Sequence, residues 1–172
     1  PLAPGAAQTA LFLHPAPIVG TFHAAGESTS YKLLTSPLSR LADNISHRVV
    51  VSKDALALIH GYIGGDYEVL FNGVELHRFR EAATHTFLFP TIFFCGRHED
   101  RKGLDVLLEA FATLPANVRL VIASNGPDTK RLQQQYATDA RIEWVGRITD
   151  DEKMAYLKGS AVFCAPSLRG ES

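Results

Sequence analysis

The stretch Pro90–Phe111, PTIFFCGRHEDRKGLDVLLEAF, decides the fold of this chain. It opens on a short apolar run, Ile92–Cys95, and passes through Gly96 into six consecutive charged or titratable residues that end at Gly103. Beyond that glycine, apolar residues recur at i, i+3, i+4 and i+7, which places them on one face of a helix. The pattern predicts a buried strand, a tight turn that carries cations, and an amphipathic helix.

The turn in this unit is predicted to bind an anion. In an open α/β sheet, such a turn lies at the carboxyl end of a strand, where ligands bind. The helix N-terminus adds free N–H groups and the positive end of the helix dipole. Because Arg97 and Lys102 lie beside that end, the residues favour a phosphate or diphosphate site. The alternative is that the turn is simply solvent-exposed, as runs of charged residues usually are.

The composition is that of an ordinary globular protein. The chain has 172 residues, of which 46% are hydrophobic and 20% charged, and its formal net charge is −1. We expect no nucleic-acid partner, because such surfaces need a clustered basic excess. No apolar run approaches the roughly 20 residues of a membrane span, and the first residues lack the basic region of a signal peptide. The chain starts at Pro1 without an initiator Met, so we expect a fragment of a longer protein.

The cysteines and histidines predict neither a disulfide nor a metal site. Cys95 and Cys164 each lie at the end of an apolar, strand-like run, which favours two buried free thiols. Free thiols are typical of a reducing compartment. The seven histidines are scattered without the spacing of zinc ligands, so we expect no structural zinc.

Strand and helix patterns alternate along the chain. Short apolar runs predict strands at 18–22, 49–51, 67–71, 91–95, 118–123, 141–145 and 161–164. Helical patterns lie at 31–44, 53–62, 104–114, 128–137 and 149–158, the last opened by a capping box at Thr149 and Glu152. This alternation predicts α/β structure with doubly wound parallel sheets. A connector without periodicity, Asn72–Phe89, divides the pattern into two units.

Four blocks of sequence resemble a known enzyme family. They are Gly20–His23 (GTFH), Leu70–Glu75 (LFNGVE, with Phe79 following), Phe94–Gly103 (FCGR…RKG) and Ala165–Ser172 (APSLRGES). In this order they resemble the retaining glycosyltransferases of family four, which have the GT-B architecture of two Rossmann-like domains. Within that family, the first and last blocks are most similar to the phosphatidylinositol mannosyltransferases of actinobacteria.

The resemblance implies a domain organisation. Residues 1–71 would be the later part of the N-terminal, acceptor-binding domain. Residues 72–172 would hold the domain crossing and the first part of the C-terminal domain, which binds the nucleotide-sugar donor. The family's N-terminal glycine loop is then expected before Pro1, and the second of its two glutamates after Ser172.

The resemblance also implies roles for individual residues. Arg97 and Lys102 match the pair that binds the donor diphosphate and stabilises the leaving group as its charge grows. Glu171 matches the glutamate that contacts the donor sugar, and Gly170 would let the backbone approach that ligand. His23 matches a histidine near the transferred sugar, with a buried structural histidine as the alternative.

Three further residues would flank the base and ribose of the nucleotide. They are Gly146, Arg147 and Lys153. For Lys153, a plain solvent-facing helix charge is an equal alternative. The resemblance departs at Ser28, where the inositol phosphate mannosyltransferases carry a lysine thought to meet the acceptor phosphate.

The implied function is retaining transfer of a hexose. The expected donor is a nucleotide sugar, GDP-mannose, and the expected acceptor is a lipid or polyol such as phosphatidylinositol, with no metal and no further cofactor. The full-length enzyme would be cytoplasmic, with peripheral association at the inner face of the plasma membrane. Two alternatives stay open: another donor, such as a UDP-sugar, or another acceptor within the family, and a non-catalytic nucleotide-sugar-binding module. We expect the 172-residue chain alone to be inactive.

Overall fold

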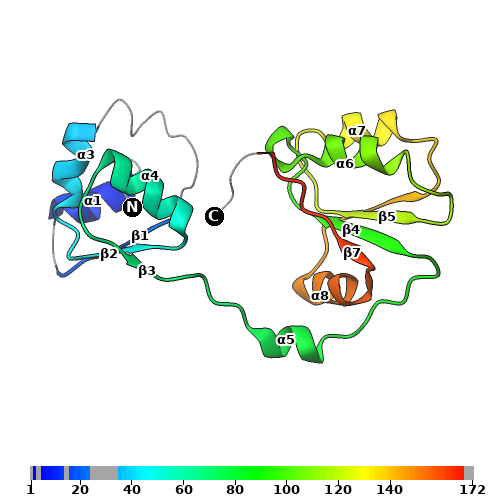
Figure 1. Ribbon diagram of the computed structural model, residues 1–172, viewed down its shortest axis with the longest axis horizontal. Helices are drawn as coiled ribbons and strands as arrows, with labels where there is room; N and C mark the ends of the chain where they lie inside the picture. Colours follow the sequence, from blue (N-terminus) through cyan, green and yellow to red (C-terminus); the bar gives the residue numbers. More distant parts are fainter. Residues whose placement is uncertain (1, 3–4, 14–15, 24–34, 169–172) are drawn as a thin grey trace. The chain divides into compact units, whose positions relative to one another are not determined.

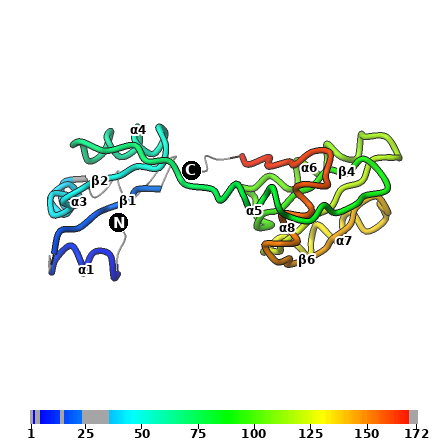
Figure 2. The backbone as a smooth tube through the Cα atoms, turned by 90° about the horizontal axis from the view of Figure 1, so that it is seen from below, coloured from blue at the N-terminus to red at the C-terminus, as the bar shows by residue number. Residues whose placement is uncertain are grey.

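The computed structural model describes residues 2, 5–13, 16–23 and 35–168, which fold into two compact units. The first unit is Pro1–Gly73 and the second is Val74–Arg169. Each is built on its own parallel sheet, as the alternation of strands and helices predicted. The course of the chain through these elements can be followed in Figures 1 and 2.

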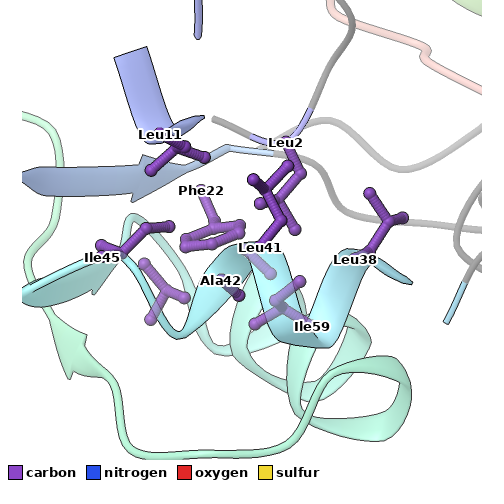
Figure 3. Packing of buried hydrophobic residues seen from close by; sticks show 10 residues of the cluster. Leu2, Leu11, Phe22, Leu38, Leu41, Ala42, Ile45 and Ile59 are labelled. Carbon is purple, nitrogen blue, oxygen red and sulfur yellow. The ribbon is translucent and has the colours of Figure 1, made fainter. Parts of the chain in front are cut away.

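The first unit holds a three-stranded parallel sheet in the order β1-β2-β3. Its strands are β1 Val19–Phe22, β2 His47–Val50 and β3 Glu68–Val69, and its described helices are α1 Ala6–Leu13, α3 Thr35–Ala42 and α4 Lys53–Tyr62. Buried side chains from both layers form one core (Figure 3): Leu2, Leu11, Phe22, Leu38, Leu41, Ala42, Ile45, Val50, Ala55 and Ile59. The apolar runs of the sequence therefore supply the core of this unit.

Local signals fix several boundaries in the first unit. Ser52 caps α4, since its hydroxyl accepts a hydrogen bond from the backbone N–H of Ala55 at 3.0 Å. Pro37 lies in the first turn of α3, where a missing N–H costs no hydrogen bond. The part of the helix prediction at residues 31–34 lies outside the described residues. The strand predicted at 67–71 is shorter in the structure, spanning only β3.

The second unit holds a four-stranded parallel sheet in the order β6-β5-β4-β7. Its strands are β4 Thr91–Cys95, β5 Arg119–Ala123, β6 Ile142–Gly146 and β7 Val162–Phe163. Its helices include α6 Leu104–Phe111, α7 Thr129–Gln135 and α8 Asp150–Gly159, and a short 3-10 helix at Asp100–Lys102 precedes α6. The predicted strand, turn and amphipathic helix are thus confirmed.

Helices cover both faces of this second sheet. Phe94 and Ile122 pack in a core with the apolar face of α6 and with Leu132 of α7. Phe93 and Val121, which alternate with them along the strands, pack on the other face with Tyr156 of α8. Figure 1 shows α6 and α7 on one side of β4 and β5 and α8 on the other. The unit is therefore doubly wound, as predicted.

The two cysteines lie on opposite faces of the same sheet. Cys95 packs in the core below α8, whereas Cys164 packs in the core below α6. Both thiols are free, in agreement with the prediction, and burial raises the pKa of each.

The connector contains a helix that the sequence pattern missed, α5 Leu76–Glu81. Contacts with α8 hold the connector in place. The Lys158 ammonium donates hydrogen bonds to the carbonyls of Arg80 (3.0 Å) and Ala82 (2.7 Å), and the His85 N–H donates to the carbonyl of Ala155 (3.1 Å). These partners are distant in the sequence, so a local pattern gives no sign of them.

Candidate functional site

A cleft of about 830 Å³ lies in the second unit, where β4, β5 and β6 end. It is lined by Arg97, Ser124, Asn125, Gly126, Pro127, Thr129, Lys130, Gln133 and Arg147. Its lining contains three cations, Arg97, Lys130 and Arg147, and among the described residues it contains no carboxylate. The carboxyl end of a parallel sheet is the expected place for a ligand. The charge of the lining suits an anionic one.

An irregularity in the sheet shapes the mouth of the cleft. The pairing of β5 with β6 shifts between Ile122 and Ala123, so that Ala123 pairs with Gly146 and one residue of β6 is left over. Both strands then turn through left-handed backbone, with φ +83° at Ser124 and φ +68° at Gly146. The two loops that line the cleft leave the sheet at these two residues.

His98 is buried behind the cleft, although it lies within the charged run of the sequence. Its side chain is fully buried, so the alternative of a solvent-exposed charged turn does not hold for this residue. The backbone of the same residue joins two loops, since its N–H donates to the carbonyl of Asn125 at 3.3 Å and its carbonyl accepts from the N–H of Asp128 at 3.1 Å. His98 therefore fastens the turn after β4 to the loop after β5.

The hydrogen bonds of the imidazole are consistent with one neutral tautomer. Nε2 lies 3.2 Å from the carbonyl of Ala123, which can only accept, so we assign the ring proton to Nε2. Nδ1 then accepts from the hydroxyl of Thr129 at 2.8 Å, and the same hydroxyl oxygen accepts from the N–H of Gly126 at 2.8 Å. Burial disfavours the charged imidazolium and lowers the pKa of His98.

The unfolding free energy is expected to fall as pH is lowered through a window set by His98. Because the pKa is lowered in the folded protein, the unfolded chain takes up the proton first. The contribution of neutral His98 is complete above the ordinary pKa of 6.5 and is lost as pH falls from there toward the folded-state pKa. The slope of the unfolding free energy is at most about 1.4 kcal/mol per pH unit for one proton.

Urea unfolding between pH 8 and pH 5, followed by the fluorescence of Trp144, measures this effect in the second unit. Trp144 is the single tryptophan of the chain, and its ring centroid lies 5.7 Å from that of His98. The control is His98→Gln, which keeps a donor and an acceptor but does not titrate in this range. The variant should have a flatter pH dependence above pH 5. Identical pH dependence in the two proteins would contradict the assignment.

Arg97 presents its guanidinium at the cleft and shares a carboxylate with Arg101. The Nε of Arg97 lies 3.1 Å from one oxygen of Glu99, and the Nε of Arg101 lies 2.6 Å from the other. The Arg97 side chain is 67% exposed, so its ion pair is weak and can open to a ligand. Arg101 lines a separate hollow of about 430 Å³ and does not line the cleft.

The structure brings together some of the residues implied by the resemblance and leaves others apart. Arg97 and Arg147 line the same cleft, and the Nε of Arg147 donates to the side-chain oxygen of Asn125 at 3.4 Å. Gly146 directly precedes Arg147. Lys153 is on α8, where it is bonded to Asp150 at 2.6 Å, and it does not line the cleft.

The remaining residues lie elsewhere. Lys102 ends the 3-10 helix before α6 and is not a lining residue of the cleft. His23 directly follows β1 in the first unit, where it is exposed. Gly170, Glu171 and the departure at Ser28 lie outside the described residues.

Four of the residues that line the cleft were not predicted as site residues. Ser124 directly follows the predicted strand at 118–123, and Thr129, Lys130 and Gln133 lie in the predicted helix at 128–137, which no motif connects with a site. The available signal was the position of that helix, because its first turns follow a strand end. Lys130 and Gln133 are three residues apart and so share one helical face.

Neither a metal site nor a membrane span emerges from the part of the chain that the structure describes. No group of three or more His, Cys, Asp or Glu side chains there could hold a metal ion. None of the described helices is long and apolar enough to cross a membrane.

Comparison with known proteins defines the class of the second unit. Residues 89–172 match the family model of glycosyl transferases group 1. This part of the chain is therefore a glycosyl transferase group 1 domain, which agrees with the resemblance seen in the sequence. The cleft lies within the matched residues.

Curated relatives extend the similarity to the whole chain. The chain is 30% identical to a phosphatidyl-myo-inositol mannosyltransferase of Mycobacterium leprae (strain TN), over 100% of this chain and 48% of the relative. It is 31% identical to one of Propionibacterium freudenreichii subsp. shermanii, over 100% of this chain and 45% of the relative. The chain thus spans about half the length of the curated relatives it matches.

Solved structures show the fold. The Anabaena protein HepE in complex with UDP superposes with a TM-score of 0.77 at 16% identity, over 96% of this chain and 50% of that one. Sucrose-phosphate synthase from Thermosynechococcus elongatus gives a TM-score of 0.66 at 19% identity, over 87% of this chain and 44% of that one. With its two units, each on a parallel sheet, the chain has the GT-B type of fold, as predicted.

Proposed function

We propose that this chain is the central part of a retaining glycosyltransferase whose donor is a nucleotide sugar. The observation that carries the proposal is the cation-lined cleft at the carboxyl end of the sheet, inside a glycosyl transferase group 1 domain. A nucleoside diphosphate is an anion whose phosphate oxygens suit such a lining. The donor we propose is GDP-mannose, and the acceptor a lipid or polyol such as phosphatidylinositol, in keeping with the names of the curated relatives.

The chemistry assigned to the cleft is stabilisation of the leaving group. Transfer breaks the bond between the sugar and the diphosphate, and negative charge grows on the departing phosphate oxygens. The Arg97 guanidinium can meet two of those oxygens at once, and Arg147 adds positive charge at the same cleft. Lys102 and Glu171 are proposed to act on the diphosphate and the sugar respectively, as the sequence blocks imply.

The donor is tested by binding. Calorimetry of the 172-residue chain should show that GDP and UDP bind and that the nucleosides guanosine and uridine bind far more weakly, because the proposed contacts of the cleft's three cations are with the phosphates. Tighter binding of GDP than of UDP would support the mannose donor. A chain that binds nucleosides as well as nucleoside diphosphates would contradict the proposal.

The reaction is tested in a protein extended at both ends to the length of the curated relatives. With GDP-mannose and phosphatidylinositol, NMR of the product should show mannose transferred with its anomeric configuration retained. Lys102→Ala should slow the transfer if that lysine binds the diphosphate. Transfer at the wild-type rate in this variant would remove Lys102 from the mechanism. An inverted product would exclude retention.

A UDP-sugar donor is the second candidate. The Anabaena neighbour was solved with UDP, and also with UDP-glucose at a TM-score of 0.76. Transfer from UDP-glucose but not from GDP-mannose by the extended protein would favour this candidate.

A further inference from the structure

Ser124 combines an unfavourable backbone conformation with a place in the cleft. Its φ of +83° makes it the only non-glycine residue with a positive φ within the described ranges. In this region the Cβ of an L-residue is close to its own backbone, and glycine is favoured for that reason. A serine here is therefore less stable than a glycine would be.

The pairing of the two strand ends imposes this conformation. The N–H of Ser124 donates to the carbonyl of Gly146, directly after the register shift between β5 and β6. Gly146 itself has φ +68°. Because both partners of this contact have left-handed backbone, Ser124 cannot relax without opening the end of the sheet.

The hydroxyl of Ser124 is available to a ligand. Its side chain lines the cleft and, among the described residues, forms no hydrogen bond with the protein. Two other polar side chains of the lining are already engaged: the hydroxyl of Thr129 bonds to His98 and to the N–H of Gly126, and the side-chain oxygen of Asn125 accepts from Arg147. A hydroxyl with no protein partner can donate one hydrogen bond and accept others.

We propose that Ser124 is a binding residue whose hydroxyl donates a hydrogen bond to a phosphate oxygen of the nucleoside diphosphate. This inference rests on the proposed function of the cleft. Arg97 and Arg147 line the same cleft, so the ligand presents anionic oxygens there, and a hydroxyl donates well to such acceptors. Residues with strained backbone are often found at binding sites, where they contact the ligand.

Two substitutions separate the hydroxyl from the strain. Ser124→Ala removes the hydroxyl and keeps a Cβ on left-handed backbone, whereas Ser124→Gly removes both. Loss of a hydrogen bond to a charged group should weaken binding of GDP about tenfold in each variant. Relief of the strain should raise the melting temperature of the second unit by about 4 °C in Ser124→Gly and leave it nearly unchanged in Ser124→Ala.

Calorimetry with GDP and UDP, together with thermal unfolding followed by Trp144 fluorescence, decides the matter. Support requires that Ser124→Ala weakens both nucleotides by the same factor, because they share the phosphates. Wild-type affinity in Ser124→Ala overturns the inference, as does a loss confined to one nucleotide, which would assign the hydroxyl to the base. If Arg97→Ala loses binding while Ser124→Ala does not, only this inference fails. If the wild-type chain binds neither nucleotide, the proposed function fails with it.

Discussion

Replacing Gly126 with alanine is expected to lower the unfolding free energy of the second unit by about 3 kcal/mol and to abolish nucleotide binding. An added Cβ would collide with three backbone atoms of His98, namely its nitrogen, carbonyl carbon and carbonyl oxygen. Backbone cannot turn aside as a flexible side chain can, so the loops after β4 and β5 must separate. Urea unfolding followed by Trp144 fluorescence measures the loss of stability.

The matched control for this variant is Gly73→Ala. Gly73 lies at the end of the first unit with no atom within 4 Å of an added Cβ, and its φ is not in the left-handed range. The unfolding free energy of the Gly73→Ala variant should stay within about 0.5 kcal/mol of the wild-type value. Equal stability of the two variants would show that the contact between Gly126 and His98 does not hold the loops together.

Replacing Arg97 with alanine is expected to weaken GDP binding by between about tenfold and a hundredfold. That range corresponds to the loss of hydrogen bonds between charged groups, about 1.5 to 3 kcal/mol. Stability should hardly change, because the Arg97 side chain is exposed and its ion pair with Glu99 is weak. Calorimetry with GDP checks the affinity, and thermal unfolding checks the fold.

Arg101→Ala is the control matched in charge and in partner. Arg101 bonds to the same carboxylate as Arg97, yet it lines the neighbouring hollow and not the cleft. The two variants change the net charge equally, so a general electrostatic effect would weaken binding in both. The diphosphate assignment requires a large loss in Arg97→Ala alone, and similar losses in the two variants would refute it.

Much of the fold could be predicted because local signals and tertiary structure agree. The run Ile92–Cys95 is buried between two helical layers, and its apolar composition predicted this. The capping box is formed as expected, since the N–H of Glu152 donates to the Thr149 hydroxyl at 3.2 Å and the Thr149 N–H donates to the Glu152 carboxylate at 2.7 Å. Such elements depend on residues a few positions apart.

The features that were not predicted depend on residues that are distant in the sequence. His98 stands between an arginine and a glutamate, which is a surface pattern, but its partner Thr129 is 31 positions away. The helix α5 in the connector is held by Lys158, which lies 78 positions from Arg80. No periodicity within a short window reports contacts of this range.

The candidate site could be predicted only in outline. The position at the strand ends and the cation Arg97 followed from the sequence. Apart from Arg147, which the resemblance implied, the other lining residues come from the loop after β5 and from the first turns of α7, and the loop after β5 begins directly after the register shift at Ala123. The pattern of apolar residues along a strand does not indicate where its pairing with a neighbouring strand shifts by one residue.

The carboxylate of Glu99, which pairs with both Arg97 and Arg101, is a counter-ion that Arg97 can exchange for another anion. If Arg97 binds a phosphate as proposed, Glu99 would keep its bond to Arg101 and would not be left as a lone anion. Entry of the proposed ligand would then exchange one negative partner for another at Arg97.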